Sequence, residues 1–159
     1  MAAECDRRIV VGVDGSPQSL DALRWAADQA RATDGWIEAV IAWEVAASFG
    51  LGPSWGYGAS YEGLAPFDFV GSARLILDDA VKEALGDHPG VRVERKIIEG
   101  HPAAVLIARS VGAHLVVVGG RGHGGFAGLL LGSVSQHVAG HAHCPVTVVR
   151  YVEDVAPAT

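Results

Sequence analysis

The sequence LVVVGGRGHGG, residues 115–125, joins a continuous apolar run to a glycine-rich segment. The pair Gly132-Ser133 follows a few residues later, at a point where another helix can begin. Backbone N–H groups approach an anion closely only where side chains are absent, and a helix N-terminus adds unpaired donors and a favourable dipole. This order of parts predicts a buried strand, a phosphate-binding loop and a helix start, and so indicates a nucleotide-binding protein.

The rest of the chain alternates short apolar runs with segments of helical spacing. Ser16 and Pro17 are typical of a helix N-cap and first turn, and Gly35 is expected to end that helix. Polar residues interrupt one of the predicted strands and place it at a sheet edge. The predicted strands are 9–13, 36–43, 91–98, 115–119 and 146–150, and the predicted helices are 17–34, 70–85, 102–111 and 133–141.

Alternating strands and helices predict an α/β fold, an open five-stranded parallel sheet with helices on both faces, Rossmann-like in type. Ligands of such sheets bind beyond the carboxyl ends of the strands, where the strand order reverses. The order 3-2-1-4-5 places the loops after the first and fourth strands side by side at that point. A length of 159 residues fits a single domain over 1–159, with its core at about 7–150.

Composition excludes several classes of protein. Twelve basic against 18 acidic residues give a net charge of −6, which argues against nucleic-acid binding. No apolar stretch reaches the roughly 18–20 residues that span a bilayer, and residues 1–8 lack a secretory signal, so we expect a cytoplasmic protein without membrane attachment. Cys5 and Cys144 are expected to be reduced there.

Segment 44–66 is rich in glycine and aromatic residues and is longer than an ordinary connection. Two interpretations stay open for it: a surface excursion packed on its own aromatic residues, or a lid or dimer contact near the site.

Other motifs are less consistent with the sequence. A P-loop requires a lysine, which is absent near residues 119–135, and a dinucleotide fingerprint requires an acidic residue about 20 positions on, whereas none lies between Glu99 and Glu153. His137, His141, His143 and Cys144 offer a weaker alternative, a zinc site. Covalent catalysis has little support, because no Gly-x-Ser-x-Gly elbow is present.

Three separated segments together resemble the universal stress protein family, and in particular its ATP-binding branch. They are VGVDGS at 11–16, Gly119-x-x-Gly122 followed nine residues later by Gly132-Ser133, and CPVTVVR at 144–150. The resemblance covers roughly residues 7–150. It implies the strand order 3-2-1-4-5, a homodimer joined through the C-terminal strand at 146–150, and ATP at the carboxyl edge of the sheet.

The resemblance also implies roles for individual residues. Asp14 is expected beside the ribose and, indirectly, an ATP-bound Mg²⁺ or Mn²⁺, while the backbone of Gly12 and Ala42 brackets the adenine. Phosphates are expected at the glycine loop and at the helix start. The candidate cofactor-binding residues are Gly12, Asp14, Ala42, Gly119, Gly120, Arg121, Gly122, Gly124, Gly125, Gly132, Ser133 and Val134.

Simpler structural roles remain open for three of these residues. Asp14 is also typical of a turn before the Ser16 cap, Ser133 of a plain N-cap, and Arg121 of a solvated loop side chain. The main functional hypothesis is an ATP-binding stress-response sensor or regulator. A slow ATP-hydrolysing enzyme and a structural dimer without ligand are the alternatives, and no efficient catalysis is expected without a base or a clamp of cations.

Overall fold

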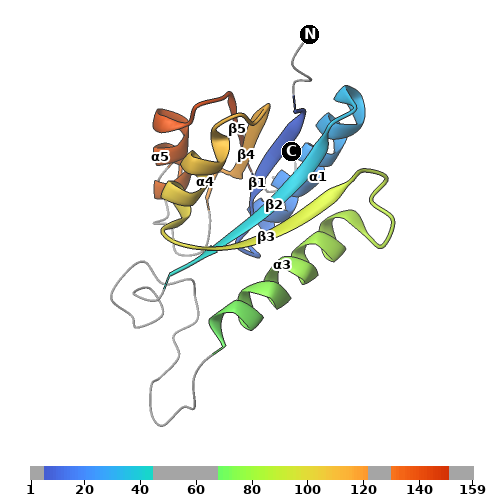
Figure 1. Ribbon diagram of the computed structural model, residues 1–159, viewed down its shortest axis with the longest axis horizontal. Coiled ribbons are helices and arrows are strands. Elements are labelled where there is room, and N and C mark those ends of the chain that lie inside the picture. The colour runs from blue at the N-terminus through green and yellow to red at the C-terminus, as the bar shows by residue number, and fades with distance from the viewer. Residues whose placement is uncertain (1–5, 45–67, 122–129, 151–159) are drawn as a thin grey trace, which may run out of the picture.

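The computed structural model describes residues 6–44, 68–121 and 130–150. Strands and helices alternate along the chain, and Figure 1 shows their arrangement. In chain order the elements are β1 (Arg8–Gly12), α1 (Pro17–Thr33), β2 (Trp36–Trp43), α3 (Phe69–Leu85), β3 (Val93–Glu99), α4 (Pro102–Ser110), β4 (Leu115–Gly119), α5 (Ser133–His141) and β5 (Val146–Val149).

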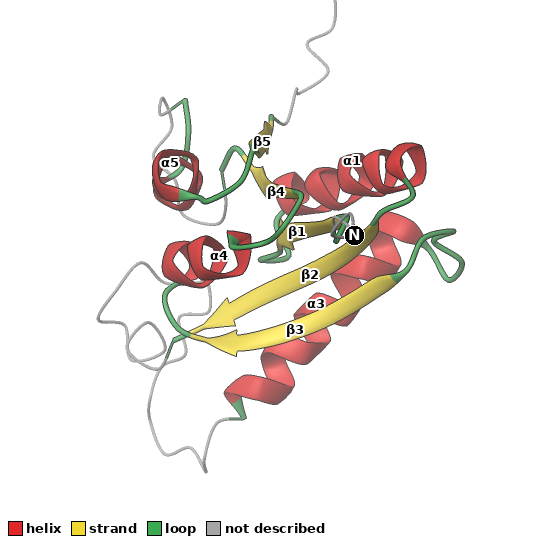
Figure 2. Ribbon diagram, turned by 45° about the horizontal axis from the view of Figure 1, so that its top comes forward, coloured by secondary structure: helices red, strands yellow, loops and turns green. Residues whose placement is uncertain are grey.

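The five strands form one sheet in the order β3-β2-β1-β4-β5, and every neighbouring pair is parallel. This confirms the predicted fold class and strand order. Figure 2 shows α1 and α3 on one face of the sheet and α4 and α5 on the other. β1 is central, and its register places Gly12 opposite Val40 of β2. Among the described residues, no helix is long and apolar enough to cross a membrane.

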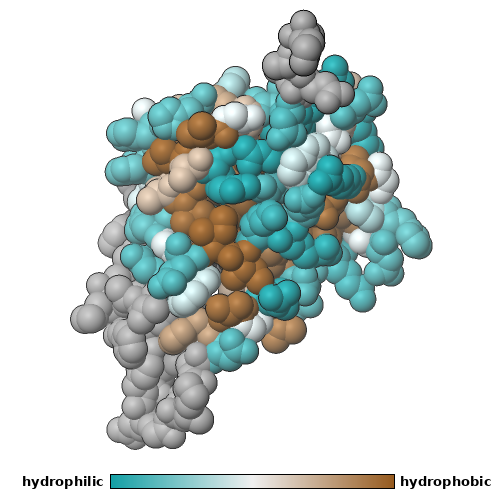
Figure 3. Space-filling model, viewed as in Figure 1, coloured by the Kyte–Doolittle hydropathy of each residue, from teal (hydrophilic) through white to brown (hydrophobic). Residues whose placement is uncertain are grey.

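Two apolar clusters cover the two faces of the sheet. Alternate residues of β1 point to opposite sides, so that Ile9 and Val11 pack under α1 and α3 while Val10 packs under α4 and α5. Seen from the α4 side, apolar side chains gather in the middle of the face and polar ones surround them (Figure 3). Strands buried on both faces explain the continuous apolar runs of the sequence.

Helix α1 ends one residue before the predicted position. Asp34, with a φ of 52°, is the left-handed residue that closes the helix, and its N–H donates to the Ala30 carbonyl. Gly35 takes part in the same helix end, as predicted, because its N–H also donates to the Ala30 carbonyl, at 2.8 Å. A Cβ there would lie 2.6 Å from the Arg7 carbonyl oxygen, so close backbone packing is a second reason for glycine at this position. Strand β3 lies at a sheet edge, as predicted, but begins two residues later than expected.

A buried carboxylate joins β1, β2 and α4. The side chain of Glu38 is 2% exposed and accepts hydrogen bonds from Arg8 at 3.1 Å and from the Arg109 Nε at 2.7 Å. Arg8 also donates to the carbonyl oxygens of Arg109 and Val111. Burial on its own raises the pKa of Glu38, but the hydrogen bonds and charges of Arg109 and Arg8 outweigh it and hold that pKa below its ordinary value.

We expect Glu38→Gln to lower the free energy of unfolding at pH 7 by about 2–4 kcal/mol, because the largely buried Arg8 and the half-buried Arg109 lose their counter-charge. The stabilisation by Glu38 is present above its unfolded-state pKa of about 4.3 and is lost as the pH falls through the lower folded-state value. Denaturant unfolding from pH 7 down to pH 3 should therefore show the variant and the wild type converging. Glu83→Gln, at an exposed position of α3, is the control and should stay within about 0.5 kcal/mol. A difference that does not depend on pH would contradict this assignment.

Candidate nucleotide-binding site

The exits of β1 and β4 lie next to each other at the carboxyl edge of the sheet. β1 pairs with β4 over Ile9–Val11, and the first turn of α1 packs directly on the end of β4. A Cβ at Gly119 would lie 2.8 Å from the Gln18 Cβ and 2.9 Å from the Gln18 carbonyl carbon. Only glycine permits this contact, so Gly119 joins the two segments that the sequence predicted to converge.

Gly12 is also close to a neighbour, but that neighbour is a side-chain tip. A Cβ there would lie 2.8 Å from Leu106 Cδ1, on the face covered by α4. Gly12 is the last residue of β1 and lies opposite Val40 of β2. One further hydrogen bond joins the two segments, because the Val13 N–H donates to the Val40 carbonyl at 2.8 Å. Packing of α4 therefore favours a small residue at position 12, although the Leu106 side chain could move aside.

Asp14 forms the turn between β1 and α1. Its Oδ1 accepts a hydrogen bond from the Ser16 N–H at 2.9 Å and another from the Ser16 hydroxyl at 2.5 Å. Ser16 in turn caps α1 by accepting from the Ser19 N–H at 3.2 Å, and Gly15 between them has a φ of 81°. The turn interpretation of Asp14 is thus correct, and it fixes one carboxylate oxygen at the strand exit.

Ala42 lies near the end of β2, the strand that flanks β1 on the side away from β4. It is 6% exposed and packs in the cluster under α4 and α5. The register places Gly12 beside Val40, so Ala42 is two residues further toward the carboxyl edge, level with the Asp14 turn. Gly12, Asp14 and Ala42 are therefore close together at one edge of the sheet.

The start of α5 is fixed against the end of β4. The Gly132 N–H donates to the Gly120 carbonyl at 2.6 Å, and the Ser135 hydroxyl lies 3.1 Å from the same oxygen. Gly120 itself is buried and donates to the Val149 carbonyl at 2.8 Å. Gly120 directly follows Gly119, which packs against the first turn of α1. Helix α5 therefore begins at the same sheet edge as the Asp14 turn.

Helix α5 differs from the other described helices at its first turn. Side chains of Ser16, Asp68 and His101 cap α1, α3 and α4, whereas the cap residue of α5 is Gly132, which provides no side-chain hydrogen bond. Gly132 has ordinary extended torsion angles and only van der Waals neighbours around its Cβ position. Neither conformation nor crowding from the described residues demands glycine here, and Gly132 has no side chain to accept from the first N–H groups of α5.

The remaining predicted residues divide into two groups. Ser133 is exposed at the first position of α5, and Val134 beside it packs partly on the apolar cluster. The backbone of Arg121 passes the helix start, with its Cα 3.5 Å from the Gly132 Cβ position. Gly122, Gly124 and Gly125 lie outside the described residues, as does nearly all of segment 44–66.

Two residues that hold this arrangement together were not predicted from the sequence. Gln18 provides the surface on which Gly119 rests, and Ser135 ties the first turn of α5 to the Gly120 carbonyl. Serine at the third position of a predicted helix is a usable signal for the second role. Gln18 carries no comparable signal, because its contact is with Gly119, more than a hundred residues away in the sequence.

The zinc alternative finds no support. The rings of His137 and His141 stack with centroids 4.8 Å apart, and Cys144 Sγ lies 3.4 Å from the Pro145 carbonyl. Burial raises the pKa of the Cys144 thiol, which disfavours the thiolate that binds metals. Within the described ranges, no three metal-ligating side chains come together.

A nucleotide-bound Mg²⁺ or Mn²⁺ requires fewer ligands from the protein than zinc does. Mg²⁺ usually keeps several waters and takes one or two carboxylates together with phosphate oxygens. Asp14, held at the strand exit by Ser16, is a suitable carboxylate for contact with such an ion or its waters. The donor set at this edge therefore fits an ion that arrives with its nucleotide better than a resident metal.

Taken together, the fold and this edge define a parallel α/β protein in which a helix capped by glycine begins at the point where the strand order reverses. Comparison with known proteins is consistent with this class. A family model described as the universal stress protein family matches residues 7–150. The chain belongs to the universal stress protein family.

Individual relatives agree with this assignment. A universal stress protein of Mycolicibacterium smegmatis is 35% identical over 143 residues, covering 89% of this chain and 45% of the relative. One from Methanocaldococcus jannaschii is 32% identical over 152 residues, covering 91% and 82%. The chain spans about half the length of several curated relatives that it matches. A crystal structure of a universal stress protein in complex with cAMP has a TM-score of 0.59, with 27% identity over 91% of this chain and 96% of that one.

We expect Gly119→Ala to destabilise the protein by about 1–3 kcal/mol, because the new methyl group meets the backbone of α1, which cannot move aside as a side-chain tip can. Gly140→Ala in α5 is the matched control. Nothing lies within 4 Å of its Cβ position, so alanine there should stabilise the helix by about 0.5–1 kcal/mol. Chemical denaturation of both variants measures the difference, and equal stabilities would contradict the close approach of α1 and β4.

Proposed function

We propose that this chain is a cytoplasmic, ATP-binding stress-response regulator that acts as a homodimer and takes ATP together with Mg²⁺ or Mn²⁺. The observation that carries the proposal is the start of α5, where the cap residue Gly132 has no side chain to bond the first N–H groups, beside the junction of β1 and β4. In the other described helices a side chain occupies this position.

Phosphate groups supply what this helix start lacks. The N–H groups of Ser133 and Val134 point out of the first turn, and an anion there satisfies them while meeting the positive end of the helix dipole. The chain is acidic overall, so backbone donors take the place that lysines occupy in other phosphate sites. The proposal also places the backbone of Gly119, Gly120 and Gly122 beside the phosphates.

The ribose and the base would lie between the N-terminus of α5 and the end of β2. Asp14 offers its carboxylate at the exit of β1, suited to ribose hydroxyls or to an ion held by the phosphates. The backbone near Gly12 and Ala42 offers donors and acceptors to the edge of an adenine. Support for an adenine nucleotide comes from the similar universal stress protein structure that contains cAMP.

The proposed dimer uses the free edge of β5. The carbonyls of Pro145 and Val149 accept hydrogen bonds from β4, so by alternation the backbone groups of Val146 and Val148 point to the open edge. All four residues of the strand are uncharged and half-buried. Such an edge favours pairing with another strand, and a second copy would form a closed two-fold interface through residues 146–150.

A regulatory role fits this chemistry better than turnover. Efficient phosphoryl transfer needs a clamp of cations and a group that positions the nucleophile. The described part of this edge instead offers backbone amides, hydroxyls and the Asp14 turn. Bound ATP at this edge would change the contacts that the chain makes with partner proteins.

The substitution Gly132→Asp tests phosphate binding at α5. Aspartate is a good N-cap, so the free energy of unfolding should stay within about 0.5 kcal/mol of the wild type or rise. Its carboxylate would take the N–H groups and repel phosphate, so we expect ATP affinity, measured by isothermal titration calorimetry, to fall at least about tenfold.

The matched control adds the same charge at the far end of the same helix. Gly140→Asp lies about 12 Å away along the helix axis, beyond the screening length of about 8 Å at physiological salt, and should bind ATP like the wild type. Its Cβ position is open. Unchanged affinity in Gly132→Asp, or equal losses in the two variants, would contradict the proposal.

Asp14→Asn separates the two roles of this residue. Asparagine keeps an oxygen that can accept from Ser16, so stability should change by less than about 0.5 kcal/mol, whereas Asp14→Ala should cost about 1 kcal/mol. Both variants remove the charge and should weaken binding of ATP with Mg²⁺. Thermal unfolding and calorimetric titration give the two quantities. Full affinity in Asp14→Asn would leave Asp14 a turn residue only.

A further inference from the structure

Two aromatic rings meet at the carboxyl end of β2. Trp43 is the last residue of this strand, next to Ala42, and its carbonyl accepts from the Gly100 N–H at 2.8 Å. Phe69 is the first residue of α3. The two rings lie nearly parallel, with centroids 6.0 Å apart and an interplanar angle of 15°, and both residues are half-buried.

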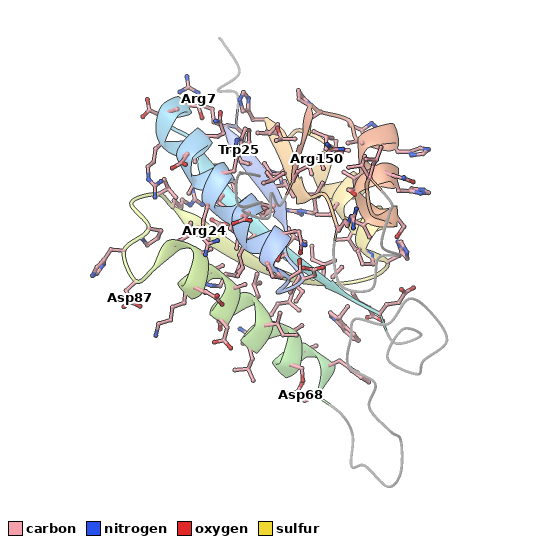
Figure 4. All side chains as sticks on the ribbon, turned by 180° about the vertical axis from the view of Figure 1, so that it is seen from behind. Arg7, Arg24, Trp25, Asp68, Asp87 and Arg150 are labelled. Atoms are coloured by element: carbon pink, nitrogen blue, oxygen red, sulfur yellow. The ribbon has the colours of Figure 1, made fainter. Side chains whose placement is uncertain are left out.

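The position of this pair follows from the fold. Trp43 continues the alternation of Ile37, Ala39 and Ile41 and so faces the side of the sheet that α1 and α3 cover. Asp68, labelled in Figure 4 at the beginning of α3, caps the helix by accepting from the Gly71 N–H at 2.8 Å. Figure 1 shows that α3 begins at the end of the sheet where β2 stops.

Helix α3 also reaches the turn that contains Asp14. The methyl group Ile76 Cγ2 lies 3.0 Å from the Cβ position of Gly15. The first two turns of α3 therefore run from the Trp43 ring toward the exit of β1. At this edge the order across the sheet is the aromatic pair by β2, Asp14 at β1, and the start of α5 at β4.

We propose that Trp43 and Phe69 form a stacking wall for the base of the bound nucleotide, and that this pair provides affinity for nucleosides over bare polyphosphate. The inference rests on the proposed function, because it places the base of the same ligand. With phosphates at α5 and the ribose by Asp14, the base extends toward β2, where the two half-exposed rings present an apolar surface. An aromatic face accepts any base, so the wall would favour nucleotides as a class and add little discrimination among bases.

The test compares ATP with inorganic tripolyphosphate, which carries the charge without the base. Stacking on an aromatic residue is worth a factor of about five to a hundred in affinity for each base. Calorimetric titrations should show Trp43→Leu and Phe69→Leu losing at least about fivefold in ATP affinity while binding tripolyphosphate like the wild type. Trp36→Leu, at the opposite end of the same strand, is the matched control and should keep wild-type affinity for both probes.

Each other outcome overturns the inference. Wild-type ATP affinity in Trp43→Leu removes the stacking role alone, and so does an equal loss for both probes. Failure of the wild-type chain to bind either probe removes the proposed function as well. If Trp43→Leu does not fold, Trp43→Phe keeps an aromatic face and should retain ATP binding within about twofold.

A spectroscopic measurement does not depend on those variants. Replacement of Trp25, Trp36 and Trp55 by phenylalanine leaves Trp43 as the sole tryptophan. ATP should then quench its fluorescence and tripolyphosphate should not. Equal responses to the two probes would overturn the proposed contact.

Discussion

No side chain fits between Gly119 and the first turn of α1, and the whole candidate site depends on this close approach. The contact with Gln18 fixes the end of β4 against the start of α1. The Gly120 carbonyl then positions the N-terminus of α5 through Gly132 and Ser135. Two segments that are more than a hundred residues apart in the sequence thus form one edge, with a carboxylate turn on one side and an uncapped helix on the other.

The distribution of charge explains why backbone amides, rather than cationic side chains, are the main donors at this edge. The chain has 12 basic residues, and two of the arginines that approach the core, Arg8 and Arg109, are held by the buried carboxylate of Glu38. That network stabilises the contact of β1, β2 and α4 and leaves the candidate site to amides, hydroxyls and the Asp14 carboxylate. In the proposed function, binding through amides at a helix start would suit a triphosphate that is recognised and released without being consumed.

Local sequence signals predicted much of this structure, and contacts between distant residues account for what they missed. Apolar runs and the Ser16-Pro17 start gave the elements and their order, because burial on both faces and capping are local in sequence. Gly35 was correctly assigned to the end of α1, but its close approach to the Arg7 carbonyl could not be predicted, because it joins residues far apart in the sequence. The pairing of Glu38 with Arg109 and the stacking of Trp43 on Phe69 depend on tertiary contacts that no spacing reveals.

An amide NMR titration of the whole chain with ATP and Mg²⁺ tests the central claim most directly, because it observes both segments in one experiment. The account predicts that the amide resonances of Ser133 and Val134, and those around Gly12 and Asp14, shift together with a single apparent dissociation constant. Shifts confined to one of the two segments, or no shifts at millimolar ATP, would contradict a shared site at this edge of the sheet.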